Sequence, residues 1–171
     1  RPTLRVPADA VLRVDDLSPD RGVDLERLSA LARLHLSPGR SPLVVVSARG
    51  LARLQVPRRI FEEGADLLGP GVEIAREALA AKLVLLGFSR VPLVEDAGTF
   101  AVRGGIVDVW SPADAAPVRL EFFGDEIESC RAFDPQTQRS EGDVAEVLLC
   151  PAREALFTPA GREAAKAAIR D

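Results

Sequence analysis

The chain has 171 residues and a mass of 18.3 kDa, enough for one medium domain or two small ones. Its 47% hydrophobic and 28% charged residues are typical of a globular protein and exclude a disordered tail. The net charge of −4 argues against a nucleic-acid-binding protein whose whole surface is basic. Because the chain contains no Met, we expect it to be an internal fragment of a longer protein.

Residues 1–87 alternate helix and strand signals. Asp24 is a candidate N-cap, and the β-branched run at 43–46 is typical of a strand buried on both faces in a parallel sheet. Gly87 follows the clearest helical segment as its expected C′ residue. Alternation of this kind predicts an α/β domain. The expected elements are a helix from Asp24 to Leu36, a strand at 43–46, a helix at 48–54, a strand at 66–68 and a helix at 73–86.

After Gly87 the apolar period changes from that of a helix to that of a strand. Gly104-Gly105 and Gly124-Asp125 separate pairs of apolar runs and predict hairpin turns. The pattern indicates a small antiparallel β-module, followed by an alanine-rich helix at 159–169. The expected strands lie at 90–94, 99–102, 106–110, 118–123, 126–133 and 144–149.

Charge is unevenly distributed along the chain. Residues 88–146 carry 12 acidic and 5 basic residues, a net charge of −7, and all five cations are arginines. An acidic surface repels the phosphate backbone, so we expect this segment not to contact DNA directly. Spaced arginines suit bidentate recognition of carboxylates on a protein partner. The alternative is that they form surface or intramolecular salt bridges.

The cysteines and the lack of targeting segments indicate the cellular compartment of the protein. Cys130 and Cys150 are not part of a Cys-x-x-Cys motif, and with His35 as the only histidine they are expected to be reduced core thiols. The sequence has no signal peptide and no apolar run long enough for a membrane span. These features predict a cytoplasmic protein with no membrane partner.

No catalytic motif is present in the sequence. It lacks the Gly-x-x-x-x-Gly-Lys-[Ser/Thr] phosphate loop and the Gly-x-Ser-x-Gly motif. No motif places a nucleophile near His35, which is expected to be structural. We therefore expect this fragment not to be an enzyme and to need no cofactor and no metal.

A longer pattern occupies residues 88–140. It consists of FSR at 88–90, GTFAVRGGIVDVWSP at 98–112, PVRLEFFGDEIES at 117–129 and FDPQTQRS at 133–140. This pattern closely resembles the UvrB-homology region of bacterial transcription-repair coupling factors (Mfd). The excision-repair protein UvrB shares the module, but Ala101 and the form of the last motif favour the coupling factors.

The resemblance implies a fold class and a division of the chain. Residues 1–87 are expected to be part of a degenerate helicase-like (P-loop-type) α/β domain without a nucleotide site. Residues 88–146 are expected to be an inserted, antiparallel β-rich UvrA-binding module. Residues 147–171 are expected to form a return strand and helix into the first domain.

The resemblance also implies a function and site residues. The family uses positions matching Arg103, Arg119 and Phe123 to contact UvrA, and Arg90 matches a further contact on the UvrB side. Strand alternation puts Arg119 and Phe123 on one face, although Phe123 at a strand end is also compatible with core packing. The expected function is therefore a non-catalytic region that recruits UvrA to stalled RNA polymerase for nucleotide excision repair.

The remaining expectations concern the parent protein and the alternatives. The parent is expected to be an ATP-dependent DNA translocase that reaches DNA and RNA polymerase through other domains. The rest of the parent chain is a further expected partner, because it can mask the UvrA surface. One alternative is a fragment of the excision-repair helicase UvrB, and another is a direct DNA-binding domain that uses the more basic first part of the chain.

Overall fold

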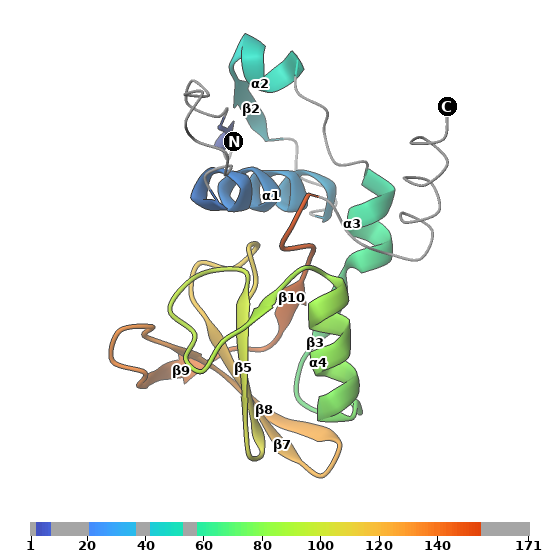
Figure 1. Ribbon diagram of the computed structural model, residues 1–171, viewed down its shortest axis with the longest axis vertical. Helices are drawn as coiled ribbons and strands as arrows, with labels where there is room; N and C mark the ends of the chain where they lie inside the picture. Colours follow the sequence, from blue (N-terminus) through green and yellow to red (C-terminus); the bar gives the residue numbers. More distant parts are fainter. Residues whose placement is uncertain (1–2, 8–20, 37–41, 53–57, 155–171) are drawn as a thin grey trace.

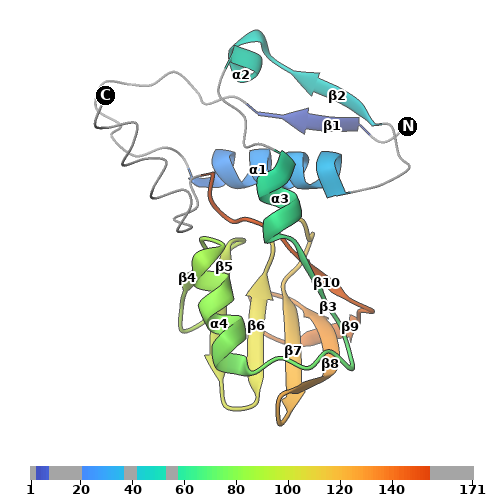
Figure 2. The same cartoon turned by 90° about the vertical axis from the view of Figure 1, so that its right-hand side faces the viewer.

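A computed structural model describes residues 3–7, 21–36, 42–52 and 58–154 of the chain. The structure is mixed α/β, and strands predominate in it. The N-terminal elements gather at one end of the molecule, and a six-stranded sheet covered by one helix occupies the other (Figures 1 and 2). The helix predicted at 159–169 lies outside the described residues.

The N-terminal part contains a two-stranded parallel sheet, β1 (Thr3–Val6) and β2 (Leu43–Val46), with helix α1 (Arg21–Leu36) packed on β1. The prediction that Asp24 caps α1 is wrong, because α1 begins three residues earlier and Asp24 lies in its first turn. An acidic residue there still interacts favourably with the helix dipole. Two short helices follow, α2 (Ala48–Ala52) and α3 (Arg58–Gly64).

Strand β2 forms where the sequence predicts it, but it is not buried on both faces. Leu43, Val44 and Val45 are 57%, 39% and 49% exposed. Within the described residues β2 pairs only with β1, and α1 packs on β1. The apolar run is therefore a strand of a parallel sheet, as predicted, whose side chains stay accessible in this chain.

The second part is built on a six-stranded sheet in the order β4-β5-β6-β7-β8-β9. The β4–β5 pair is parallel and every other pair in this sheet is antiparallel. Gly104 and Gly124 lie in the hairpin turns with φ of +57° and +64°, as expected for glycine turn residues. The strands are β4 (Ser89–Arg90), β5 (Thr99–Arg103), β6 (Ile106–Trp110), β7 (Val118–Phe123), β8 (Glu126–Phe133) and β9 (Ser140–Asp143).

Helix α4 (Arg76–Leu85) covers one face of this sheet (Figure 2). The helix was predicted to begin at residue 73, but residues 72–74 lie extended beside β8 instead. There Ile127 N–H donates to Val72 O at 2.9 Å, and Ile74 N–H donates to Asp125 O at 2.7 Å. Gly87 ends the helical segment with φ of +87°, which confirms its predicted role.

A second antiparallel pair, β3 (Asp66–Leu68) and β10 (Val147–Leu149), completes the core of this part. Leucines of α4, β3 and β10 share one hydrophobic cluster with the inward side chains of the sheet. The predicted division of the chain at residues 87/88 and 146/147 stays a prediction. The largest fully buried members of the cluster are Phe100, Leu68, Leu79, Leu83, Leu120, Ile127 and Leu149.

Both cysteines are free and buried, as predicted. Cys130 belongs to the cluster of the sheet, and Cys150 packs with α1 and α3. Burial raises the pKa of both thiols, that of Cys150 to about 11. Neither thiol is therefore activated as a nucleophile at neutral pH. Among the helices of the described residues, none has the length and apolar character needed to cross a membrane.

Candidate protein-interaction surface

The face of the sheet opposite α4 carries a row of charged side chains. Cross-strand register places Asp108 of β6 beside Arg119 of β7, and Arg119 beside Arg131 of β8. Because alternate residues of a strand point to opposite faces, these side chains share the face that does not pack on α4. Arg103 of β5 reaches the same row, since its guanidinium bonds to Asp108.

Asp108 is the centre of this arrangement. Its side chain is fully buried, and it accepts two hydrogen bonds from Arg119, Nε to Oδ1 at 2.7 Å and Nη2 to Oδ2 at 3.0 Å. Arg103 donates from Nη2 to Oδ2 of the same carboxylate. The fork of Arg119 is the bidentate geometry in which arginine–carboxylate pairs are strongest. One buried carboxylate therefore binds two arginines from two different strands.

Arg119 is held on several sides and is only 15% exposed. Its guanidinium carbon lies 4.8 Å from the centre of the Phe133 ring, and its Nη1 donates to Gln138 O at 3.4 Å. The hydrogen bonds to Asp108 raise the pKa of Arg119, so it stays charged. Arg103 is 45% exposed and is the member of the pair that offers its guanidinium to solvent.

The charged row continues on β8 and β9. Arg131 approaches Glu121 of β7 at 3.4 Å and Asp143 of β9 at 3.3 Å. Ser129 donates to Glu121 at 2.6 Å. These ion pairs are more exposed than that of Asp108, so each contributes little to stability.

Phe123 stands at the end of β7 and is 78% exposed. Alternation along β7 puts it on the same face as Arg119 and Glu121, as predicted. The exposure excludes the alternative that it packs in the core. An accessible aromatic side chain beside arginines has the composition of a protein-binding hot spot.

Arg90 lies away from the other three predicted site residues. Strand β4 pairs Arg90 with Phe100, whose side chain points into the core under α4. Paired residues share a face, so Arg90 lies on the α4 face, where it borders a cavity of about 320 Å³ together with Val84 of α4. The structure brings Arg103, Arg119 and Phe123 to the face away from α4 and leaves Arg90 on the α4 face, at the edge of the sheet.

Sequence reasoning did not identify Asp108 as part of the surface. The signal was present, because a charged residue interrupts the apolar run at 106–110. The alternation of β6 alone does not say which arginines it meets. That depends on the register of β6 with β5 and β7.

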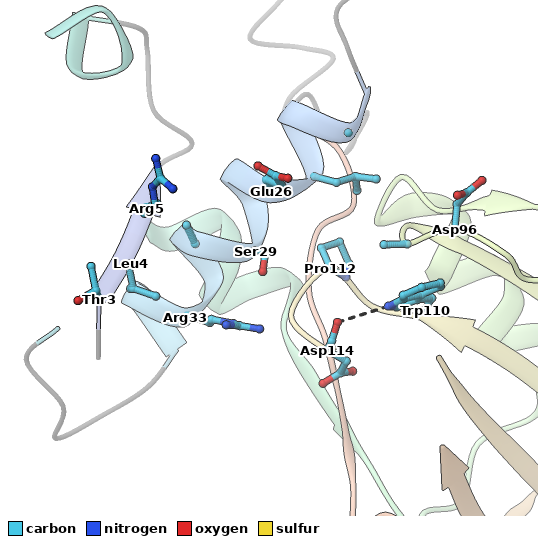
Figure 3. Close-up of a pocket in the computed structure, with 14 residues that line it drawn as sticks. Thr3, Leu4, Arg5, Glu26, Ser29, Arg33, Asp96, Trp110, Pro112 and Asp114 are labelled. Carbon is cyan, nitrogen blue, oxygen red and sulfur yellow. Dashed lines mark hydrogen bonds between the residues drawn. The ribbon is translucent and has the colours of Figure 1, made fainter. Parts of the chain in front are cut away.

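A larger cavity of about 780 Å³ lies between α1 and the loops of the sheet (Figure 3). Trp110 and Asp114 face Arg33 of α1 across it, and Trp110 Nε1 donates to Asp114 O at 3.4 Å. Asp114 Oδ2 is buried and has no hydrogen-bond partner among the described residues. Burial raises the pKa of Asp114 to about 6, although the Arg33 charge acts in the opposite direction.

The raised pKa of Asp114 predicts a pH-dependent stability. Between its unfolded pKa of about 4 and its folded pKa of about 6, the folded state keeps a proton that the unfolded state has lost. This contribution therefore lowers the free energy of unfolding as pH rises from 4 to 6. We expect Asp114→Asn to gain stability relative to the unmodified chain over that range, measured as urea midpoints. If the difference in urea midpoint between the two proteins does not change with pH, the pKa of Asp114 is not raised.

The described residues offer little for catalysis. No three His, Cys, Asp or Glu side chains in this part of the chain lie close enough together to hold a metal ion. The ring of His35 packs against that of Phe61 with 5.5 Å between their centres, and burial lowers its pKa. The surface around Asp108 is suited to binding and contains no activated nucleophile.

Comparison with known proteins places these features in a family. A family model described as the UvrB interaction domain matches residues 67–154, a range that contains all four predicted site residues. The chain is 49% identical over 168 residues to a transcription-repair-coupling factor of Myxococcus xanthus, covering 98% of this chain and 14% of that protein. It is 32% identical over 134 residues to that of Bacillus subtilis (strain 168), covering 78% and 11% respectively. The chain thus spans only a small part of the length of these relatives.

Proposed function

Because the chain belongs to the UvrB interaction domain family, we propose that it is a non-catalytic part of a transcription-repair coupling factor that binds UvrA. In this role it recruits UvrA to stalled RNA polymerase for nucleotide excision repair. The similarity to transcription-repair-coupling factors over nearly the whole chain supports this choice over a fragment of UvrB.

The observation that carries the proposal is the surface formed by Arg103, Arg119 and Phe123. Asp108 holds both guanidinium groups in place before any partner arrives, so little side-chain entropy is lost on binding. Phe123 adds an apolar anchor on the same face. A protein surface rich in carboxylates with an apolar pocket is the complement of this face.

The remaining parts of the proposal concern the longer protein. Residues 1–87 belong to a degenerate helicase-like α/β domain without a nucleotide site, and residues 88–146 are the inserted UvrA-binding module. Residues 147–171 return to the first domain. The parent is an ATP-dependent DNA translocase of the cytoplasm that reaches DNA and RNA polymerase through other domains and masks the UvrA surface. The parallel β1–β2 pair and the relatives' greater length support this organisation.

Calorimetric titration of the chain with UvrA tests the proposed function. Phe123→Ala removes the exposed anchor without opening a cavity, because the side chain is 78% exposed. We expect the variant to bind UvrA about tenfold more weakly, a loss of about 1.4 kcal/mol. The matched control is Leu67→Ala, which removes a side chain of β3 that is 50% exposed.

The outcomes separate the proposal from its alternatives. The control is expected to bind as the unmodified chain does. Absence of UvrA binding by the unmodified chain would refute the proposed function. Binding to DNA with an affinity that falls steeply with salt would support the alternative of a DNA-binding domain instead.

A further inference from the structure

Strand β5 has an open edge on the side of β4. Only Thr99 and Phe100 of β5 pair with β4. Val91 N–H donates to Phe100 O at 2.9 Å, so the backbone polar groups of Phe100 face β4. Because every second residue of a strand directs these groups to the same side, those of Val102 face the same way.

Strand β4 does not cover Val102, because the chain bends at Pro92 and Leu93, directly after Val91. Proline fixes its own φ at about −65°, away from the φ of a regular parallel strand. The same bend accounts for the wrong prediction of a strand over 90–94: the observed strand is Ser89–Arg90, which shares only Arg90 with the predicted range. Within the described residues no strand pairs with Val102 on this side. Such an edge is a template for an added strand.

A groove runs between this edge and helix α4. It is the cavity of about 320 Å³ that Arg90 borders, and its apolar lining includes Phe100 and Val102 of β5 and Ala80 and Val84 of α4. Val84 is 57% exposed. An apolar side chain of an added strand would bury this surface, because alternate residues of that strand point toward α4.

Arginines surround the same edge. Arg90 lies at one end of the groove, and Arg76 of α4 reaches Gly104 O with Nη1 at 2.7 Å. The Nε of Arg76 is buried and has no hydrogen-bond partner among the described residues. Arg103 follows Val102 directly. With Glu77 as the only acid of the lining, these charges favour an acidic occupant.

We propose that UvrA inserts an extended acidic segment along the open edge of β5, pairing with the backbone of Val102. One apolar side chain of the segment enters the groove under α4, and carboxylates meet Arg90 and Arg76. The inference rests on the proposed function and deepens it. It gives Arg90 a place in the interface although it lies on the opposite face from Arg103, because both residues border the same edge.

Amide hydrogen exchange of the isotope-labelled, unmodified chain tests the pairing directly. In the free chain the Val102 amide is expected to exchange rapidly, and with saturating UvrA its exchange is expected to slow by at least tenfold.

A second test replaces Val102 with proline, which removes the N–H at the open edge of β5 and breaks no hydrogen bond between β5 and β6. Val102→Pro is expected to weaken UvrA binding at least tenfold. Val102→Ile keeps both the N–H and the apolar lining, so a greater loss for Val102→Pro than for Val102→Ile belongs to the missing N–H.

The two proposals fail in different ways. If the unmodified chain does not bind UvrA, the proposed function is refuted. If it binds UvrA while Val102 exchange is unchanged, strand addition is refuted and the proposed function stands. Equal binding by a folded Val102→Pro variant would also overturn strand addition, and its thermal unfolding transition shows whether the variant is folded.

Discussion

Replacing Arg103 and Arg119 together with alanine is expected to weaken UvrA binding by about 2–5 kcal/mol, or about 30-fold to several thousand-fold. The two guanidinium groups are fixed by one buried carboxylate, so removing them deletes a preorganised pair of positive charges. It also leaves Asp108 buried and unpaired, which gives the surface the wrong sign for an acidic partner. Calorimetric titration with UvrA measures the loss.

Two further variants separate charge from geometry in this prediction. Arg103→Ala alone leaves the Arg119–Asp108 fork intact, so the fold is retained and any lost affinity belongs to Arg103. Arg119→Lys keeps the charge but cannot form the fork. Arg139→Ala is the matched control, because Arg139 is an exposed arginine of the same part of the chain. A folded double variant that binds UvrA as tightly as the control would remove both arginines from the interface.

Three strands with one buried face, β6, β7 and β8, were predictable from the sequence to the residue. The runs at 106–110, 118–123 and 126–133 alternate apolar and polar side chains because one face packs under α4. Strand β9 has the sequence SEGD and all four residues are exposed, so no periodicity marks it. It forms because β8 offers it a hydrogen-bonding edge, which is a tertiary effect.

Only part of the arrangement of the candidate site was predictable from the sequence. Alternation predicted that Arg119 and Phe123 share a face, and the structure confirms it. The burial of Arg119 against Asp108 depends on cross-strand register, which the sequence does not specify. The separation of Arg90 depends on the parallel pairing of a two-residue strand that Pro92 cuts short. Both are properties of chain pairing and not of local sequence.

Asp108→Ala is expected to lower the free energy of unfolding by about 3–5 kcal/mol, because it leaves the largely buried Arg119 without its counter-charge. The matched control is Asp143→Ala, which breaks the ion pair with Arg131 at a carboxylate that is 87% exposed and is expected to cost at most about 1 kcal/mol. Denaturant unfolding of both variants at neutral pH measures the difference. Replacing the buried pair together, Asp108→Leu with Arg119→Met, is expected to recover most of the loss, because no buried charge then lacks a partner. If Asp108→Ala lowers the free energy of unfolding no more than Asp143→Ala does, Asp108 does not hold the two arginines in place. The proposed UvrA-binding surface is then not preorganised.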